Sequence, residues 1–321
     1  MIGQDVKRAA ALLKEGALVA IPTETVYGLA ANALNDSAVA QIFEAKERPA
    51  YDPLIIHTDQ IEKIQHLVEE IPAPLKKLLD AFSPGPLTFL LRKKLDGISD
   101  QVTAGLPTVA VRIPAHPVTQ ELLSLLDFPV AAPSANPFGY ISPTRAKHVA
   151  DQLGEQVPYI LDGGNCDFGL ESTIVGLTED GQVRVFRKGG ISIEDIEGIV
   201  GPVLVNDVSA SNPKAPGMLK SHYAPKTPIY VGQTSKVISN LSGKKIAYIG
   251  FNMLNFELPV EDQYLLSMGF DLKEAASNLF AVMRQLDQSK KYDAIVADWF
   301  PDQGIGKAIN DRLRRASSEF Q

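Results

Sequence analysis

Two cations that stand close together are the first residues suited to chemistry. Lys46 and Arg48 lie in the segment Lys-Glu-Arg-Pro, after a predicted helix and before a predicted buried strand. Lysine supplies a point charge and arginine a bidentate fork, so the pair suits a polyphosphate whose charge shifts during displacement. Cations at a helix C-terminus also complement the helix dipole, so a purely structural role stays open.

A third cation, Arg112, ends the strand pattern that begins at Thr108. A buried arginine needs an acidic partner. That partner is either a carboxylate of the protein or the carboxylate of an amino-acid substrate held by two parallel contacts. We expect the second role for Arg112.

Small polar side chains recur next to several predicted strands. They occur in segments 22–29 (Pro-Thr-Glu-Thr-Val-Tyr-Gly-Leu), 132–137 (Ala-Pro-Ser-Ala-Asn-Pro) and 171–173 (Glu-Ser-Thr), and Arg187 leaves a further strand. Each segment alone is typical of a turn whose side chains bond their own backbone. Their recurrence at strand ends predicts a pocket large enough for a nucleotide.

The elements that must position these residues form a mixed α/β pattern. Helical segments alternate with the early strands, whereas the later strands follow glycine turns without intervening helices, so the pattern is not a simple βαβ repeat. We predict strands at 17–21, 54–57, 87–91, 109–113, 129–132, 159–161, 172–177 and 183–186, and helices at 1–13, from a cap at Asp36 or Ser37 to Lys46, at 118–126 and at 144–153.

The pattern breaks at 209–228, where serine, proline, glycine and lysine replace apolar periodicity. We therefore predict a first domain at 1–208, a linker at 209–228 and a second domain at 229–321, as the length of 321 residues allows. The second domain should be a small Rossmann-like α/β unit, with strands at 229–231, 245–249 and 294–297 and a helix at 272–286.

Composition excludes several classes of protein. A net charge of -7 disfavours indiscriminate nucleic-acid binding, although a local basic groove stays compatible with it. The single cysteine, Cys166, rules out an intrachain disulfide or a multi-cysteine zinc site and favours the reducing cytoplasm. No apolar run approaches the roughly 20 residues of a membrane span, so we expect no membrane insertion. No histidine has metal-ligand spacing, so no protein-built metal site is predicted.

In order, Pro-Thr-Glu-Thr-Val-Tyr-Gly, Lys-x-Arg, Ser-x-Asn and Glu-Ser-Thr resemble the YrdC-type threonylcarbamoyl-AMP synthase family in its long, two-domain form. The resemblance continues through 215–225 and 304–313. It implies a YrdC-like twisted mixed-sheet domain with a large cleft, a linker and a Rossmann-like α/β domain. It also implies that L-threonine, bicarbonate and ATP yield threonylcarbamoyl-AMP and pyrophosphate, for threonylcarbamoyladenosine modification of tRNA next to the anticodon.

The resemblance implies residue roles as well. Lys46 and Arg48 would be the catalytic phosphate ligands, and Asp52 stands where the family often has asparagine. Mg²⁺ is expected with ATP, held mainly by nucleotide oxygens and water. Segment 216–225 is the candidate lid. The implied ATP set is Lys46, Arg48, Asp52, Thr108, Ser134, Asn136, Ser142, Arg187 and Tyr223, and the implied L-threonine set is Thr25, His57, Arg112, Ala132 and Thr173.

Two other functions stay open. An RNA-binding or ribosome-associated module would show salt-sensitive RNA binding without ATP turnover. A carbamoyl-transfer maturation factor would bring cysteine-rich zinc modules, which this sequence lacks. For a synthase, the expected partner is the tRNA threonylcarbamoyl-transfer machinery, with direct RNA or tRNA contact a further possibility.

Overall fold

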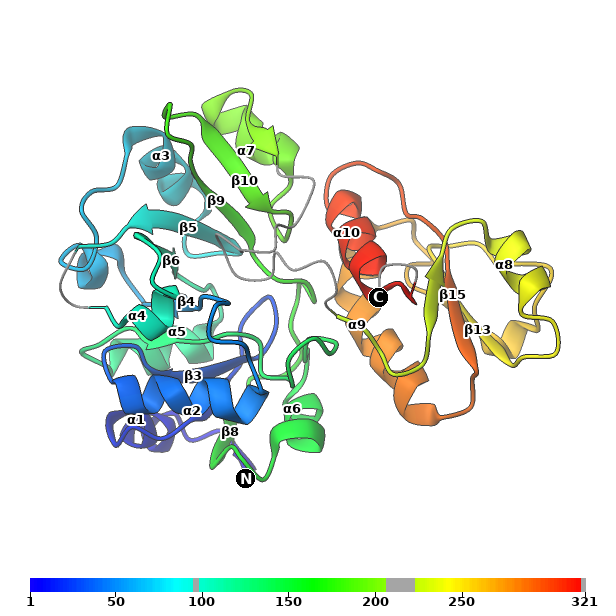
Figure 1. Cartoon of the computed structure of the whole chain (residues 1–321), viewed down its shortest axis with the longest axis horizontal. Coiled ribbons are helices and arrows are strands. Elements are labelled where there is room, and N and C mark those ends of the chain that lie inside the picture. The colour runs from blue at the N-terminus through cyan, green and yellow to red at the C-terminus, as the bar shows by residue number, and fades with distance from the viewer. Residues whose placement is uncertain (95–97, 206–222, 319–321) are drawn as a thin grey trace.

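The structure, a computed structural model, describes residues 1–94, 98–205 and 223–318 (Figure 1). Two sheets organise these residues, and both agree with the predicted mixed α/β class. The predicted linker (209–228) and the predicted lid (216–225) lie outside the described residues as far as residue 222, and only their last residues are described.

The larger sheet is mixed and the smaller one is parallel throughout its described pairs. Figure 1 shows the two sheets in separate parts of the molecule. In spatial order, the larger sheet runs β1 (Ile2–Gly3), β8 (Tyr159–Leu161), β2 (Val19–Ile21), β3 (Gly28–Asn32), β7 (Val130–Ala131), β4 (Ile55–His57), β6 (Thr108–Arg112), β5 (Leu87–Arg92), β9 (Thr173–Leu177), β10 (Val183–Arg187) and β11 (Leu204–Val205), and the smaller sheet β12 (Ile229–Val231), β15 (Ala294–Ala297), β13 (Ile246–Gly250) and β14 (Gln263–Leu265).

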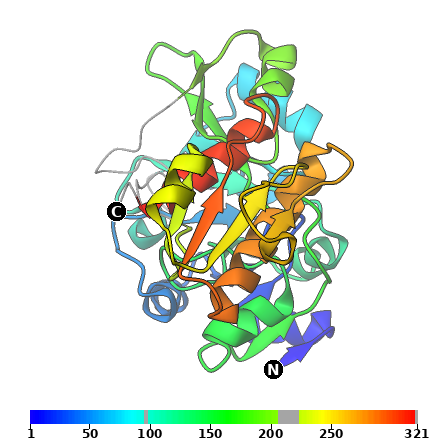
Figure 2. The same cartoon turned by 90° about the vertical axis from the view of Figure 1, so that its right-hand side faces the viewer.

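Helices pack around both sheets. Figure 1 shows α9 and α10 between the smaller sheet and the larger domain, and α8 on the far side. Figure 2 looks onto the smaller sheet from that far side. The helices are α1 (Val6–Lys14), α2 (Asp36–Lys46), α3 (Ala73–Phe82), α4 (Asp100–Thr103), α5 (Pro117–Ser124), α6 (Ala146–Leu153), α7 (Ile193–Val200), α8 (Thr234–Asn240), α9 (Leu272–Ser289) and α10 (Gly306–Ala316), with 3-10 turns η1 (Ile61–Ile64) and η2 (Val260–Asp262).

Helix α2 delivers the Lys-x-Arg pair. Its N-cap is Asn35, whose side chain accepts a bond from the Ala38 amide (3.1 Å), so the predicted cap at Asp36 or Ser37 was one or two residues late. The helix stops because Glu47 adopts the left-handed conformation (φ 53°). That reversal turns the chain inward and buries Arg48.

The segment 22–27 joins β2 to β3 as the connection of an antiparallel hairpin. Strand β3 was not predicted, because its residues Gly-Leu-Ala-Ala-Asn have weak strand propensity. Gly28 lies so close to the segment that follows β7 that an added Cβ would stand 3.2 Å from the Cβ of Ala132. The hairpin therefore brings the Thr-Glu-Thr segment beside the segment that carries Ser134.

The two domains share apolar packing. Val26, Ile141 and Leu170 from the first domain belong to the same buried cluster as the core of the second. At Gly169 (φ 65°) an added Cβ would lie 2.5 Å from the Cα of Ser277 in α9, so only glycine permits this approach. In the described part of the chain, no helix is long and apolar enough to cross a bilayer.

Candidate active site

A pocket of about 560 Å³, counting the solvent at its mouth, opens at the ends of several strands of the larger sheet. Three arginines and five hydroxyl side chains line it, which suits anionic and polar ligands. Its lining residues are Thr23, Thr25, Val26, Gly28, Arg48, Ile55, His57, Arg112, Ala132, Pro133, Ser134, Glu171, Ser172, Arg187 and Tyr223.

The pocket brings together eight of the predicted site residues. Four belong to the predicted threonine set and four to the predicted nucleotide set. These are Thr25, His57, Arg112 and Ala132, and Arg48, Ser134, Arg187 and Tyr223. The other six do not line this pocket: Lys46, Asp52, Thr108, Asn136, Ser142 and Thr173.

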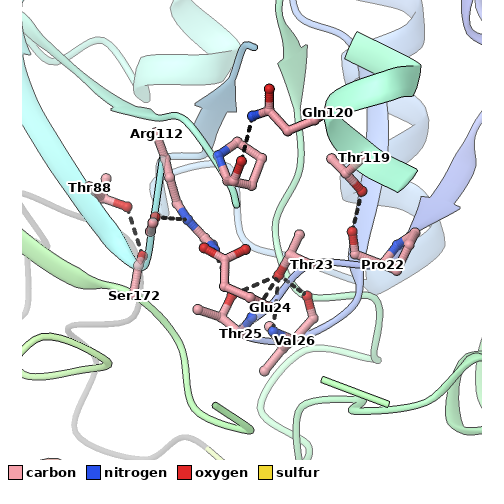
Figure 3. Close-up of polar contacts among 12 residues, drawn as sticks. Pro22, Thr23, Glu24, Thr25, Val26, Thr88, Arg112, Thr119, Gln120 and Ser172 are labelled. Atoms are coloured by element: carbon pink, nitrogen blue, oxygen red, sulfur yellow. Dashed lines mark hydrogen bonds and ion pairs between the residues drawn. The ribbon is translucent and has the colours of Figure 1, made fainter. Parts of the chain in front are cut away.

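Arg112, at the end of β6, is held from three directions (Figure 3). Its Nη1 donates to Oγ1 of Thr25 (2.8 Å) and its Nε donates to the carbonyl of Gly85 (3.2 Å). Its Nη2 lies 2.8 Å from Oε1 of Glu24, yet neither oxygen of that buried carboxylate accepts a hydrogen bond within the described residues. The contact is an ion pair without an aligned N–H, because distance alone does not make a hydrogen bond. The acidic partner of Arg112 in this structure is thus a protein carboxylate, and the expected contact with a substrate carboxylate stays a prediction.

Thr23 organises the loop that presents Thr25 and Glu24. Its hydroxyl donates to the carbonyl of Val26 (2.6 Å) and accepts from the amides of Thr25 and Val26 (3.1 Å each). The Thr23 and Thr25 hydroxyls also lie 2.7 Å apart. The turn chemistry predicted for this segment is present, and the same turn fixes the side chains that face the pocket (Figure 3).

His57, at the end of β4, is buried beside Arg112. Burial lowers the pKa of His57 from its ordinary value of 6.5 to about 3, and the positive charge of Arg112 adds to that lowering. The imidazole is therefore neutral at physiological pH. A neutral imidazole in this position can contact a ligand through hydrogen bonds but carries no charge.

We expect His57 to make the protein less stable in acid. The unfolded chain takes up a proton on this residue below about pH 6.5, whereas the folded chain does not until about pH 3, so the free energy of unfolding falls as the pH falls through that window. Urea unfolding of the wild type and of His57→Gln between pH 7 and 4 checks this. The wild type should lose more stability than the variant, and parallel curves would contradict the prediction.

Lys46 and Arg48 occupy different places. Nζ of Lys46 is buried and donates to the carbonyls of Ser134 and Asn136, which ties α2 to the Ser-x-Asn loop. Burial, and then the charge of Arg48, hold the pKa of Lys46 well below its ordinary value.

Arg48, in contrast, lines the pocket, and its Nη2 lies 2.9 Å from the Asp52 carboxylate. Burial raises the pKa of Asp52, although Arg48 opposes that shift.

Arg187 approaches the pocket from the end of β10. Its Nε donates to the Ser172 carbonyl and its Nη2 to the Ser172 hydroxyl, at 3.0 Å each. That hydroxyl also lies 2.7 Å from Oγ1 of Thr88. Burial lowers the pKa of Arg187 to about 10, so it stays protonated at neutral pH.

The remaining predicted residues support the pocket or lie apart from it. The Asn136 amide donates to the carbonyls of Pro137 and Tyr140, and the Thr173 hydroxyl donates to the carbonyl of Ile191. Thr108 begins β6 and pairs with Arg92, at the opposite end of the strand from Arg112. Its predicted nucleotide contact stays a prediction without support from the pocket.

Several lining residues were outside the predicted site sets, including Thr23, Glu171 and Ser172. Their motifs, Thr-Glu-Thr and Glu-Ser-Thr, were visible in the sequence, but only Thr25 of the first and Thr173 of the second were predicted to contact a ligand. Apolar lining residues such as Ile55 carry no chemical signal that could have revealed them.

Fold and pocket together define a two-sheet α/β protein with a pocket whose lining suits anionic and polar ligands. Residues 11–189 match a family described as telomere recombination, and residues 191–318 match the threonylcarbamoyl-AMP synthase C-terminal domain. The chain is 42% identical to the threonylcarbamoyl-AMP synthase of Pyrococcus abyssi (97% of this chain, 94% of the relative) and 41% identical to that of Bacillus subtilis (97% and 92%).

A solved structure agrees with these relatives. The crystal structure of P. abyssi Sua5 complexed with L-threonine superposes with a TM-score of 0.90 at 38% identity, covering 99% of this chain and 97% of that chain. The chain belongs to the threonylcarbamoyl-AMP synthase family.

Proposed function

We propose that this chain forms threonylcarbamoyl-AMP and pyrophosphate from L-threonine, bicarbonate and ATP. The observation that carries the proposal is the presence of Arg112 in one pocket with Arg48 and Arg187. The first guanidinium suits the carboxylate of an amino acid, and the other two suit the phosphates of a nucleotide. That P. abyssi Sua5 forms a complex with L-threonine supports L-threonine as a ligand of this chain.

The reaction requires two bond-forming steps. The threonine amine adds to the carbon of bicarbonate with loss of water and gives an N-carboxylate. An oxygen of this carboxylate then attacks the α-phosphorus of ATP, and the bond to the leaving pyrophosphate breaks. Orientation of the two substrates, with cationic stabilisation by Arg48 and Arg187, is the contribution we assign to the pocket.

We assign each half of the pocket to one substrate. Thr25, His57, Arg112 and Ala132 would contact threonine, and Arg48, Ser134, Arg187 and Tyr223 the nucleotide. Four predicted residues that do not line the pocket would position its segments through their hydrogen bonds: Lys46, Asn136, Ser142 and Thr173. For Asp52, whose carboxylate faces Arg48, we propose that it orients that guanidinium rather than contacting ATP itself.

Mg²⁺ would enter with ATP. Among the described residues no group of three histidine, cysteine or acidic side chains could hold a metal ion. Glu171 is the single carboxylate among the lining residues, and Arg312 and Ser142 already engage it. The pocket therefore does not fit a resident Mg²⁺, and we assign the ion to the phosphates of the substrate.

We also propose the domain division 1–208, 209–228 and 229–321, which the places of β11 in the larger sheet and β12 in the smaller sheet support. The activated product would pass to the tRNA threonylcarbamoyl-transfer machinery, which acts on the adenosine next to the anticodon. We propose the cytoplasm, where tRNA and ATP meet, as the compartment.

The test is pyrophosphate release from purified protein with ATP, Mg²⁺ and bicarbonate, with mass spectrometry for the adduct. We expect threonylcarbamoyl-AMP with L-threonine, and at least roughly a hundredfold less adduct with L-valine, which replaces the hydroxyl by a methyl group. Folded protein that binds ATP without forming the adduct would contradict the proposal. Salt-sensitive RNA binding in that case would favour the RNA-binding alternative.

A further inference from the structure

Arg312 of α10 reaches from the second domain into the first. Its side chain is fully buried, and its Nε donates to Oε2 of Glu171 (2.8 Å). Its Nη2 donates to the carbonyl of Lys188 (3.0 Å), and its Nη1 to Asp311 of its own helix (2.6 Å). One guanidinium thus joins the segment that enters β9 to the segment that leaves β10, and both border the pocket.

A second arginine, Arg284 of α9, holds the neighbouring segment. It is buried, and it donates through Nε to the carbonyl of Ser142 (3.2 Å) and through Nη2 to the carbonyl of Ile141. Its Nη1 donates to Gln152 (2.8 Å), and its guanidinium lies 5.1 Å from the ring centre of Tyr140. The second domain therefore also fixes the backbone on either side of the Ser142 side chain.

One hydrogen bond joins the residues that the two arginines hold, Ser142 and Glu171. The Ser142 hydroxyl donates to Oε1 of Glu171, the carboxylate oxygen that Arg312 does not contact. Burial alone would raise the pKa of Glu171, but Arg312 and then Arg187 hold it below its ordinary value. Glu171 is therefore ionised and accepts bonds from both domains.

Side chains of the second domain also contact Tyr223. Its ring, which lines the pocket, lies 5.0 Å from the guanidinium carbon of Arg312 and 5.2 Å from that of Arg315. The ring also stacks on Phe280 of α9, with centroids 5.5 Å apart. Two pocket-lining residues, Glu171 and Tyr223, and Ser142 behind them thus contact side chains or segments held by the second domain.

We propose that the second domain builds the nucleotide-side wall of the pocket, with Arg312 and Arg284 as its positioning residues. Neither arginine lines the pocket, so they act through Glu171, Ser142 and Tyr223. The inference rests on the proposed function, because it assigns this wall to ATP. It predicts that losing either arginine weakens ATP binding while threonine binding, whose proposed side-chain contacts all come from the first domain, is retained.

The test compares Arg312→Met, Arg312→Lys and Arg284→Met with the matched control Arg314→Met. Arg314 is an exposed residue of the same helix, and its guanidinium carbon lies 5.4 Å from the ring centre of Trp299. Calorimetry measures the binding of L-threonine and of ATP separately, and steady-state assays give both KM values. We expect Arg312→Met and Arg284→Met to raise the KM for ATP at least roughly tenfold, with threonine affinity within about twofold. Arg312→Lys should recover part of the loss, and the control should match the wild type.

Equal losses of ATP and threonine binding, or unchanged ATP binding in a folded variant, would overturn the inference. If Arg312→Met fails to fold, Glu171→Gln and the double variant Glu171→Gln/Arg312→Met take its place, because removing both charges avoids a buried unpaired carboxylate. Both should show the same selective loss of ATP affinity. Wild-type turnover alone tests the proposed function, so the two failures are distinguishable.

Discussion

Arg112→Met should reduce kcat/KM for L-threonine roughly 100- to 1000-fold, a loss of about 3 to 4 kcal/mol of transition-state stabilisation. The variant removes the buried cation at the end of β6 that Thr25 and Glu24 orient. It also leaves the Glu24 carboxylate buried beside an apolar side chain, and an unpaired buried charge lowers the free energy of unfolding. Initial rates over a range of threonine concentrations, at saturating ATP, measure the effect.

Two further variants separate recognition from folding in this experiment. Adding Glu24→Gln to the Arg112→Met background removes the unpaired charge and should recover stability without recovering threonine binding. Arg92→Met, at the exposed far end of the adjacent strand β5, should leave the kinetics unchanged. Threonine kinetics close to those of the wild type in Arg112→Met would refute the carboxylate contact.

Lys46→Met should lower kcat/KM for ATP about 100-fold and also lower the melting temperature. The ammonium group supplies hydrogen bonds to the carbonyls of Ser134 and Asn136, and two buried acceptors without donors cost about 1 to 3 kcal/mol each. The Ser-x-Asn loop would then lose its tether to α2. Steady-state kinetics together with thermal unfolding measure both effects.

The matched control is Lys147→Met, because Lys147 is an exposed lysine paired with Asp151 on α6. It should change neither quantity. Normal ATP kinetics in a destabilised Lys46→Met variant would show that the tether contributes to stability alone. It would also remove Lys46 from the residues proposed to position the pocket segments.

Much of the fold was predictable because its strands are apolar runs bounded by turn residues. The predicted strand at 159–161 and those at 229–231 and 294–297 match β8, β12 and β15. Strand β3 escaped prediction because alanine and glycine favour it only through burial against β2 and β7. Helix α7 was not predicted either, although Ser192 caps it.

Pocket lining was predictable where a motif contributes a side chain to the pocket, as for Arg112 and Arg187, whose ligand contacts stay predictions. It was less predictable where the side chains of a motif form hydrogen bonds with the backbone. Lys46 and Asn136 belong to recognisable motifs, yet their side chains bond carbonyls instead of facing the pocket. The contacts of Arg284 and Arg312 were beyond sequence reasoning, because they join residues more than about 120 positions apart and only the fold brings them together.

The backbone contact at Gly169 limits how such a protein could be rebuilt by gene fusion or fission. Cutting the second domain away would expose Val26, Ile141 and Leu170 and leave the Glu171 carboxylate without Arg312. A freestanding version of the first domain would need polar substitutes for those three side chains and a new cation for Glu171. Exchanging either half for that of a distant homologue would therefore require matching residues on both sides of the junction.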